Sequence, residues 1–160
     1  QTPSIYENLS VFQNLEMSFP RGRSVFGCLT FRRTTDVIDR VHEVAEQVML
    51  KDSLYLEEAG LLSHGQKQWL EIGMLLMQDP ELLMLDEPVA GMSVKEREQT
   101  AVLLNKISQN RSVVVIEHDM EFVKRIAHKV TVLHQGKVLM EGKMDKVQSD
   151  PRVVEVYLGH

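Results

Sequence analysis

The sequence has one cysteine and few aromatic residues, and it lacks any long apolar run. Of its 160 residues, 6% are aromatic, and Cys28 is the single cysteine. A disulfide within the chain is therefore excluded, and a reducing compartment is the simpler interpretation. Because no stretch reaches the ~18 consecutive apolar residues of a membrane span, the pattern predicts no transmembrane helix. The length fits a single globular domain.

A surplus of basic residues is lacking as well. The chain has 18 Lys and Arg against 23 Asp and Glu, which gives a formal net charge of -5. Proteins that bind nucleic acid usually present a basic face to the phosphates. The charge balance therefore argues against a nucleic-acid partner.

What is present is a distinctive stretch from Leu62 to Ser93, around which the rest of the chain is organised. Ser63 and Gln66 have the S-x-x-Q spacing of a capping box, which predicts that a helix begins here. The unpaired backbone N–H groups and positive dipole end of such a helix are a natural seat for phosphate. Apolar residues then recur at helical spacing until residues 78–80, Gln-Asp-Pro, end the helix.

A short apolar strand follows this helix and ends in two acids. Leu82 to Leu85 is a run without polar alternation, which predicts a strand covered on both faces of a parallel sheet. Asp86 and Glu87 come next, at the carboxyl end, where open α/β sheets bind ligands. Adjacent carboxylates there favour Mg²⁺ and a positioned water, although a helix cap or a solvated turn is the commoner role of such a pair.

The second half of the chain alternates helix and strand in the same way. Val113 to Ile116 predicts another buried strand, and His118 follows it closely. If the two strands are neighbours, the imidazole reaches the same sheet edge as the acids. Residues 130–140 predict a hairpin with Gly136 at its turn. The alternation predicts an α/β layer architecture.

Residues 93–98 and Trp69 are interpreted as structural rather than functional. Ser93 and Glu96 have the spacing of another capping box, which opens a helix to about Ile107. We interpret the charges from Glu96 to Glu98 as a face of that helix, and Trp69 as a core residue.

Three ordered motifs resemble those of an ABC-type ATPase. They are the signature motif, the Walker B segment and the switch histidine, represented here by Leu62-Ser63-His64-Gly65-Gln66, by Leu82 to Glu87 and by His118. The sequences of residues 86–93, 114–120 and 151–159 are similar to those of the importer subunits for branched-chain amino acids and amides. With His64, the signature motif is most similar to that of the urea importer's ATP-binding subunit. The resemblance implies an α/β fold: a partial P-loop NTPase (RecA-like) ABC ATPase core with a helical signature subdomain.

The resemblance implies ATP and Mg²⁺ as cofactors. Asp86 would hold Mg²⁺ through water, Glu87 would be the general base for the attacking water, and His118 would contact the γ-phosphate. Gln1 would be the lid-loop glutamine, which senses the metal and faces the transporter.

The resemblance also implies partners. In a head-to-tail dimer, Ser63, Gly65 and Gln66 would bind the γ-phosphate of a nucleotide held by a second ATP-binding subunit. His64 replaces a usual glycine and places bulk and a donor near that phosphate. Transmembrane permease subunits would be the other partners, which implies a peripheral position on the cytoplasmic face of the inner or plasma membrane. The arginine-rich residues 21–33 are either a solvated loop or a docking segment for a permease.

A phosphate-cradling loop of the form G-x-x-x-x-G-K-[ST] is missing from the sequence. Without it, the β- and γ-phosphates lose their backbone nest and their lysine. We therefore interpret residues 1–78 as the helical signature subdomain after the lid-loop glutamine, and residues 79–160 as the C-terminal part of the nucleotide-binding core. Because residue 1 is Gln, we expect the sequence to begin inside a gene product. Because the loop is missing, we expect the chain to have little activity alone.

The leading hypothesis is a partial ATP-hydrolysing subunit of an ABC importer for urea or a related amide or amino acid. One alternative is a non-catalytic interaction module that offers Ser63 to Gln66 in trans to an intact ATPase. Another is a lobe of a chromosome or DNA-repair ATPase, which needs long heptad arms and usually a basic surface, and neither is visible.

Overall fold

The computed structural model describes residues 4–20 and 33–158. The chain divides into two compact units, residues 1–116 and 117–160, each of which is considered by itself. The predicted boundary between residues 78 and 79 stays a prediction. Gln1, Cys28 and most of the arginine-rich segment lie outside the described residues. Across the described ranges, no helix is long and apolar enough to cross a membrane.

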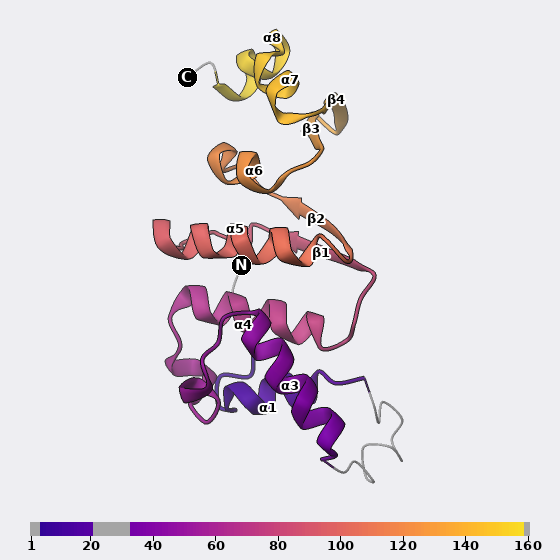
Figure 1. Ribbon diagram of the computed structural model, residues 1–160. Coiled ribbons are helices and arrows are strands. Elements are labelled where there is room, and N and C mark those ends of the chain that lie inside the picture. The colour runs from indigo at the N-terminus through magenta and orange to yellow at the C-terminus, as the bar shows by residue number, and fades with distance from the viewer. Residues whose placement is uncertain (1–3, 21–32, 159–160) are drawn as a thin grey trace. The chain divides into compact units, whose positions relative to one another are not determined.

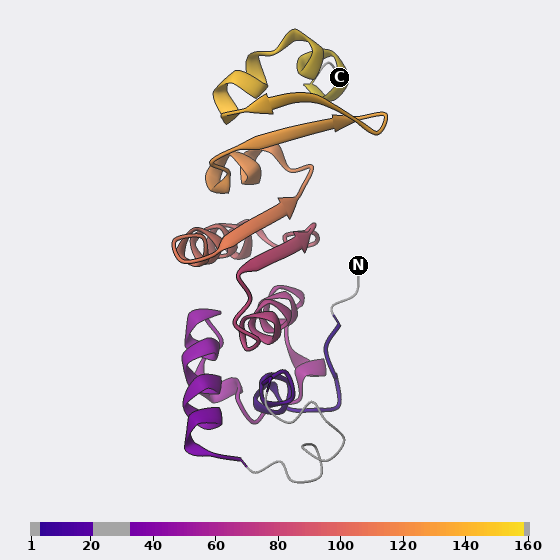
Figure 2. The ribbon, with the colours of Figure 1, turned by 90° about the vertical axis from the view of Figure 1, so that its right-hand side faces the viewer.

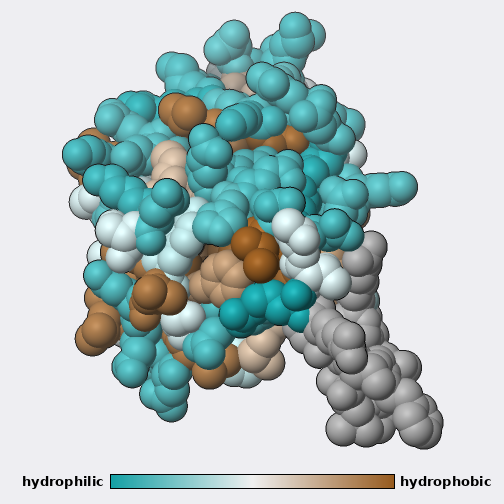
Figure 3. All heavy atoms as spheres, turned by 60° about the horizontal axis from the view of Figure 1, so that its bottom comes forward, coloured by the Kyte–Doolittle hydropathy of each residue, from teal (hydrophilic) through white to brown (hydrophobic). Residues whose placement is uncertain are grey.

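The first unit begins with a cluster of helices: α1 (Val11–Met17), α3 (Thr35–Gln47) and α4 (His64–Leu76), which contact one another in pairs (Figure 1). Two 3₁₀ turns, η1 (Asp52–Leu54) and η2 (Ala59–Leu61), connect α3 to α4. The side chains that are fully buried in this cluster include Val11, Leu15, Val37, Val41, Val44, Leu70, Ile72 and Leu76. The face of the molecule that lies at the bottom of Figure 1 is largely hydrophilic with scattered hydrophobic side chains (Figure 3).

Gly73 allows α4 to approach its neighbours closely. A Cβ atom at this position would lie 3.0 Å from Leu15 Cδ2 of α1 and 3.3 Å from Val48 Cγ2. Carbon atoms prefer about 3.5–4.0 Å, so a larger residue would require Leu15 or Val48 to give way. The glycine therefore allows α4 and α1 to pack closely.

The capping boxes form as predicted. Ser63 precedes α4, and Ser93 precedes α5 (Val94–Ile107); in both cases the cap side chain and the third helical side chain exchange hydrogen bonds with the backbone. Ser10 makes a third box before α1. Each box satisfies two backbone N–H groups that the helix itself leaves without partners, so these helix starts are locally encoded.

The two acids lie at the end of a two-stranded parallel sheet made of β1 (Leu82–Asp86) and β2 (Ser112–Ile116). Their register runs from Leu82↔Ser112 to Asp86↔Ile116, which confirms that the two predicted strands are neighbours. Helix α5 lies along one face of the sheet, as the two perpendicular views agree (Figures 1 and 2).

The prediction that β1 is covered on both faces is wrong for the described part of the chain. Leu83 and Leu85 are buried, whereas Met84, between them, is 65% exposed. Alternate residues of a strand point to opposite faces, so this pattern means that only one face is covered. An apolar run does not distinguish the two cases, because its outward residues are also apolar.

α5 also connects to the helical cluster. The indole Nε1 of Trp69, in α4, donates a hydrogen bond to Thr100 Oγ1, in α5, over 2.9 Å. Trp69 is 6% exposed, which confirms its interpretation as a core residue. Thr100 is fully buried, and its hydroxyl in turn donates to the backbone carbonyl of Glu96.

The second unit contains a hairpin between two groups of helices. Its elements are α6 (Met120–Ile126), β3 (Val130–His134), β4 (Lys137–Gly142), α7 (Met144–Ser149), α8 (Pro151–Val153) and the π-helical turn η3 (Val154–Leu158). β3 and β4 are antiparallel. Gln135 and Gly136 join them with φ angles of 49° and 74°, the backbone that a type I′ turn requires. The predicted hairpin with Gly136 at its turn is confirmed.

A pH effect is expected in this unit because Asp150 is held by Arg152. Asp150 accepts hydrogen bonds from the Arg152 guanidinium at 2.8 Å and from its backbone N–H at 2.9 Å. These contacts lower the pKa of Asp150 to about 2, with the side-chain hydrogen bond as the largest cause. Because the carboxylate is stabilised in the folded state, its contribution is complete above the unfolded pKa of ~3.9 and is lost as the pH falls toward 2.

The Asp150→Asn variant should therefore differ from the wild type in urea midpoint above pH 4, and the difference should shrink between pH 4 and pH 2. Asp145→Asn, at an exposed position in α7, is the control and should show no such convergence. A difference between the wild type and Asp150→Asn that is the same at pH 6 and pH 2 would contradict the assignment.

Candidate functional site

The two predicted acids lie at the carboxyl end of β1 and are both exposed. Asp86 is the last residue of the strand. Glu87 follows in a left-handed backbone conformation with φ 48°, and its N–H donates to Ile116 O of β2 over 2.9 Å. A residue other than glycine is strained in this region and persists there only where the surroundings hold it. The sheet therefore fixes the backbone of Glu87.

The tip of α4 is formed by Ser63 and the first turn of the helix. Ser63 Oγ accepts the Gln66 N–H at 3.2 Å, and Gln66 Oε1 accepts the Ser63 N–H at 2.9 Å. The Gln66 carbonyl oxygen is thus used by the cap. Gly65 is buried in the same turn.

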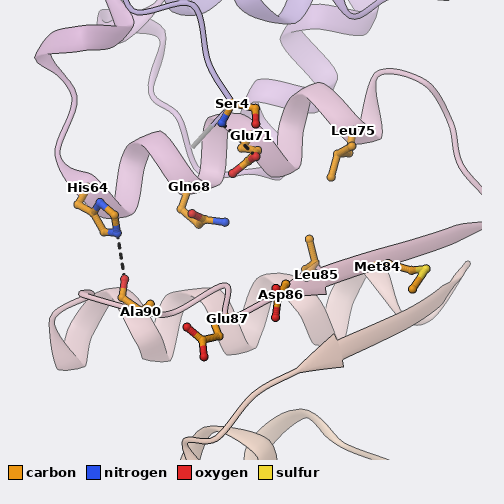
Figure 4. Close-up of a pocket in the computed structure, with 10 residues that line it drawn as sticks. All are labelled: Ser4, His64, Gln68, Glu71, Leu75, Met84, Leu85, Asp86, Glu87 and Ala90. Carbon is orange, nitrogen blue, oxygen red and sulfur yellow. Dashed lines mark hydrogen bonds between the residues drawn. The ribbon is translucent and has the colours of Figure 1, made fainter. Parts of the chain in front are cut away.

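His64, the residue that departs from the usual signature, contacts the turn after Glu87. Its Nε2 lies 3.0 Å from Ala90 O, and since a carbonyl only accepts, this nitrogen carries the proton (Figure 4). The next residue, Gly91, has a φ of 71°, and a Cβ there would be 3.4 Å from the imidazole. The N–H group of His64 that is predicted to lie near a phosphate therefore donates to Ala90 O of the same chain.

A pocket of about 190 Å³ separates α4 from the end of β1 (Figure 4). Its lining includes His64 and Gln68 of α4, the acids Asp86 and Glu87, and Ala90 of the turn. The structure thus brings three predicted site residues from two separate segments to one pocket. Ser63, Gly65 and Gln66 do not line it.

Sequence reasoning missed the role of Glu96, which connects the starts of α4 and α5. One carboxylate oxygen accepts hydrogen bonds from Ser93 N at 2.9 Å and Ser93 Oγ at 2.7 Å, and the other accepts from Ser63 Oγ at 3.2 Å. The hydrogen bond from the Ser93 hydroxyl is the largest of the causes that lower the pKa of Glu96, so the side chain is an anion at neutral pH. The interpretation of Glu96 as part of a charged helix face does not include this link to Ser63, which only the structure shows.

The Glu96 carboxylate also lies against Gly65. A Cβ atom at position 65 would be 2.4 Å from Glu96 Oε1, closer than non-bonded atoms approach. A larger residue at position 65 would therefore require the Glu96 side chain to move away. The local Ser93-x-x-Glu96 spacing revealed the cap, but no local pattern could reveal a link to Ser63, 33 residues away in the sequence.

The remaining predicted site residues stay untested by the geometry. His118 belongs to the second unit, where its backbone N–H donates to Glu117 Oε2 at 3.0 Å. Its place beside the acids stays a prediction, and Gln1 lies outside the described residues.

A capped helix tip, a parallel strand ending in two acids and a turn that contacts that tip are the features expected of an ATP-binding cassette, and comparison with known proteins agrees. The ABC transporter family profile matches residues 1–90, more than half of the sequence, and the chain belongs to this family. A profile of branched-chain amino acid ATP-binding cassette transporters matches residues 137–160.

Two of the similar curated proteins are ATP-binding proteins of branched-chain amino acid transport. The chain is 34% identical to BraF of Pseudomonas aeruginosa, a high-affinity branched-chain amino acid transport ATP-binding protein, over 96% of this chain and 61% of BraF. It is 31% identical to LivG of Escherichia coli K12, of the same description, over 98% of this chain and 62% of LivG. The chain thus spans about three-fifths of the length of these relatives.

Solved structures confirm the fold class. The structure superposes on MJ1267, an ATP-binding cassette of an ABC transporter, with a TM-score of 0.82 and 27% identity, covering 98% of this chain and 66% of that one. The ADP conformation of MJ1267 gives a TM-score of 0.78 and 28% identity over 96% of this chain and 64% of that one. The predicted partial RecA-like ABC ATPase core is therefore confirmed.

Proposed function

We propose that this chain is part of a subunit that binds and hydrolyses ATP to drive an ABC importer. The observation that carries the proposal is the position of Asp86 and Glu87, at the carboxyl end of a parallel strand and on one pocket with His64. Family membership supports it.

The acids suit a magnesium nucleotide. Among the described residues, no group of three or more His, Cys, Asp and Glu side chains could hold a metal ion. Mg²⁺ does not need such a group, because it usually binds through one or two carboxylates, several waters and the substrate phosphates. Asp86 would hold the ion, which neutralises charge on the phosphates when bound. Glu87 would accept the proton of the attacking water, and His118 would contact the γ-phosphate.

The tip of α4 would act on a nucleotide in a second ATP-binding subunit. Helix N-termini bind anions through their unpaired N–H groups and dipole. Ser63, Gly65 and Gln66 form that tip, so a head-to-tail dimer would place them on the γ-phosphate of the partner's ATP. Gln1 would sense the metal and face the permease subunits, at which the cassette would bind to the cytoplasmic side of the membrane.

Branched-chain amino acids are the solute class that the relatives' names support. The matched C-terminal segment, residues 137–160, points to the same group of transporters. Urea or another amide is the narrower proposal, and it depends on the signature with His64. The solute is carried by other subunits, so uptake measurements with the assembled importer would decide between urea and leucine.

A complete cassette tests the ATPase proposal. The part of BraF that has no counterpart here would be joined to this chain in its BraF order, and ATP turnover measured. We expect steady hydrolysis that falls about 100-fold in Ser63→Ala, comparable to the loss of one hydrogen-bond donor to transition-state charge. The 160-residue chain alone should hydrolyse little ATP.

The same measurement distinguishes the ATPase from the alternative, a non-catalytic interaction module. A folded complete cassette that hydrolyses no ATP itself but stimulates an intact ATPase through Ser63 would favour the non-catalytic interaction module. Circular dichroism and size-exclusion chromatography of the cassette would establish that it is folded.

A further inference from the structure

The hydroxyl of Ser63 has only one proton to donate. In this structure it donates that proton to Glu96 Oε1 over 3.2 Å, while Ser63 Oγ accepts the Gln66 N–H. A phosphate oxygen carries no proton at neutral pH and must also be an acceptor. Ser63 therefore cannot donate to Glu96 and to a phosphate at the same time.

Glu96 lies close to Gly65 as well as to the Ser63 hydroxyl. Its Oε1 also lies against Gly65, where even a Cβ atom would be 2.4 Å away. Ser63 and Gly65 are two of the three residues proposed to contact the phosphate. An internal carboxylate thus contacts two of the residues proposed to bind the anion, and its negative charge repels that anion.

Glu96 is kept in this place by α5. Ser93 donates to its second oxygen from both the backbone N–H and the hydroxyl, at 2.9 and 2.7 Å. These bonds do not involve Ser63, so the carboxylate can lose the Ser63 proton and still cap α5. The hydrogen bond between Ser63 and Glu96 is therefore the contact that can open.

We propose that Glu96 is a positioning residue that competes with the γ-phosphate for Ser63, so that nucleotide binding in trans displaces the Ser63–Glu96 hydrogen bond. This inference rests on the proposed function of the α4 tip. The consequence is that wild-type Glu96 weakens nucleotide binding at the tip, and that its neutral counterpart binds more tightly.

Glu96→Gln is the variant that isolates this competition. A Gln in the third helical position preserves the capping box, as Gln66 does after Ser63 in this same chain. Its carbonyl oxygen can still accept from Ser93 N, and its NH₂ group can donate to Ser63 Oγ. The Ser63 proton is then released for a phosphate, and one negative charge is removed.

The test uses the 160-residue chain mixed with an intact relative that has its own phosphate-binding loop and whose signature serine is replaced by alanine. The probe is Mg²⁺ with the non-hydrolysable analogue AMP-PNP, and analytical ultracentrifugation gives the dissociation constant of the mixed dimer. We expect Glu96→Gln to lower this constant about tenfold and Ser63→Ala to raise it about tenfold. Glu98→Gln, the same change at an exposed position of α5, should leave it unchanged.

The outcomes distinguish the competition by Glu96 from the proposed function of the α4 tip. If Ser63→Ala weakens the dimer while Glu96→Gln leaves it unchanged or weakens it, the competition is wrong and the proposed tip function stands. If neither variant changes the analogue-dependent association, the tip does not bind the nucleotide and both are wrong. Glu96→Ala provides a second variant, since it also removes the acceptor and should likewise tighten the dimer.

Discussion

Glu87→Gln should remove ATP hydrolysis from the complete cassette, with a fall in kcat of at least about 100-fold, the usual contribution of a general base. Glutamine has the same shape but cannot accept a proton from water. The left-handed backbone at φ 48° is equally strained for both residues, so the substitution leaves the turn and its hydrogen bond to Ile116 in place. AMP-PNP binding should therefore be unchanged, and phosphate release in a coupled assay measures the effect.

Glu81→Gln is the matched control for this variant. Glu81 is exposed and precedes β1, at the opposite end of the same strand from Glu87. It should retain wild-type turnover. Turnover in Glu87→Gln within a few-fold of the wild type would show that the water is activated by another group.

Leu15→Ala should destabilise the first unit by about 2–5 kcal/mol, which is the range for removing a buried leucine side chain. Leu15 is fully buried and lies where α1 meets α4. Urea unfolding followed by circular dichroism gives the free energy of unfolding. Met17→Ala, on the same helix at a position that is 60% exposed, is the control and should change it by less than about 1 kcal/mol.

A substitution at Gly73 tests whether this residue packs against Leu15. Gly73→Ala places a methyl group 3.0 Å from Leu15 Cδ2 and should cost about 1–3 kcal/mol as an overpacked site. In the double variant with Leu15→Ala, the new methyl enters the space that leucine leaves. The combined loss should therefore be smaller than the sum of the two single losses. Strict additivity would show that the two residues do not contact each other.

The sequence predicted the features that depend on local chemistry. The capping boxes at Ser63 and Ser93 formed because a cap needs only residues three positions apart. The hairpin at Gly136 formed because its turn needs a residue that tolerates positive φ. Parallel pairing of β1 with β2 followed from the helix between them, since a crossover connection joins parallel strands.

The features that sequence reasoning missed depend on contacts between distant segments. The hydrogen bonds of Glu96 with Ser63 and of His64 with Ala90 join residues 33 and 26 positions apart, and neither helix alone requires them. The one-sided burial of β1 was missed for a different reason. An apolar run records which side chains avoid water, but not how many layers of the described chain cover them.

The hydrogen bond between Trp69 and Thr100 has a practical consequence. Trp69 is the single tryptophan of the chain, and it spans the boundary between α4 and α5. Its fluorescence spectrum therefore reports on the docking of these two helices without an attached dye. A red shift of this spectrum would show that water reaches the indole as the two helices separate.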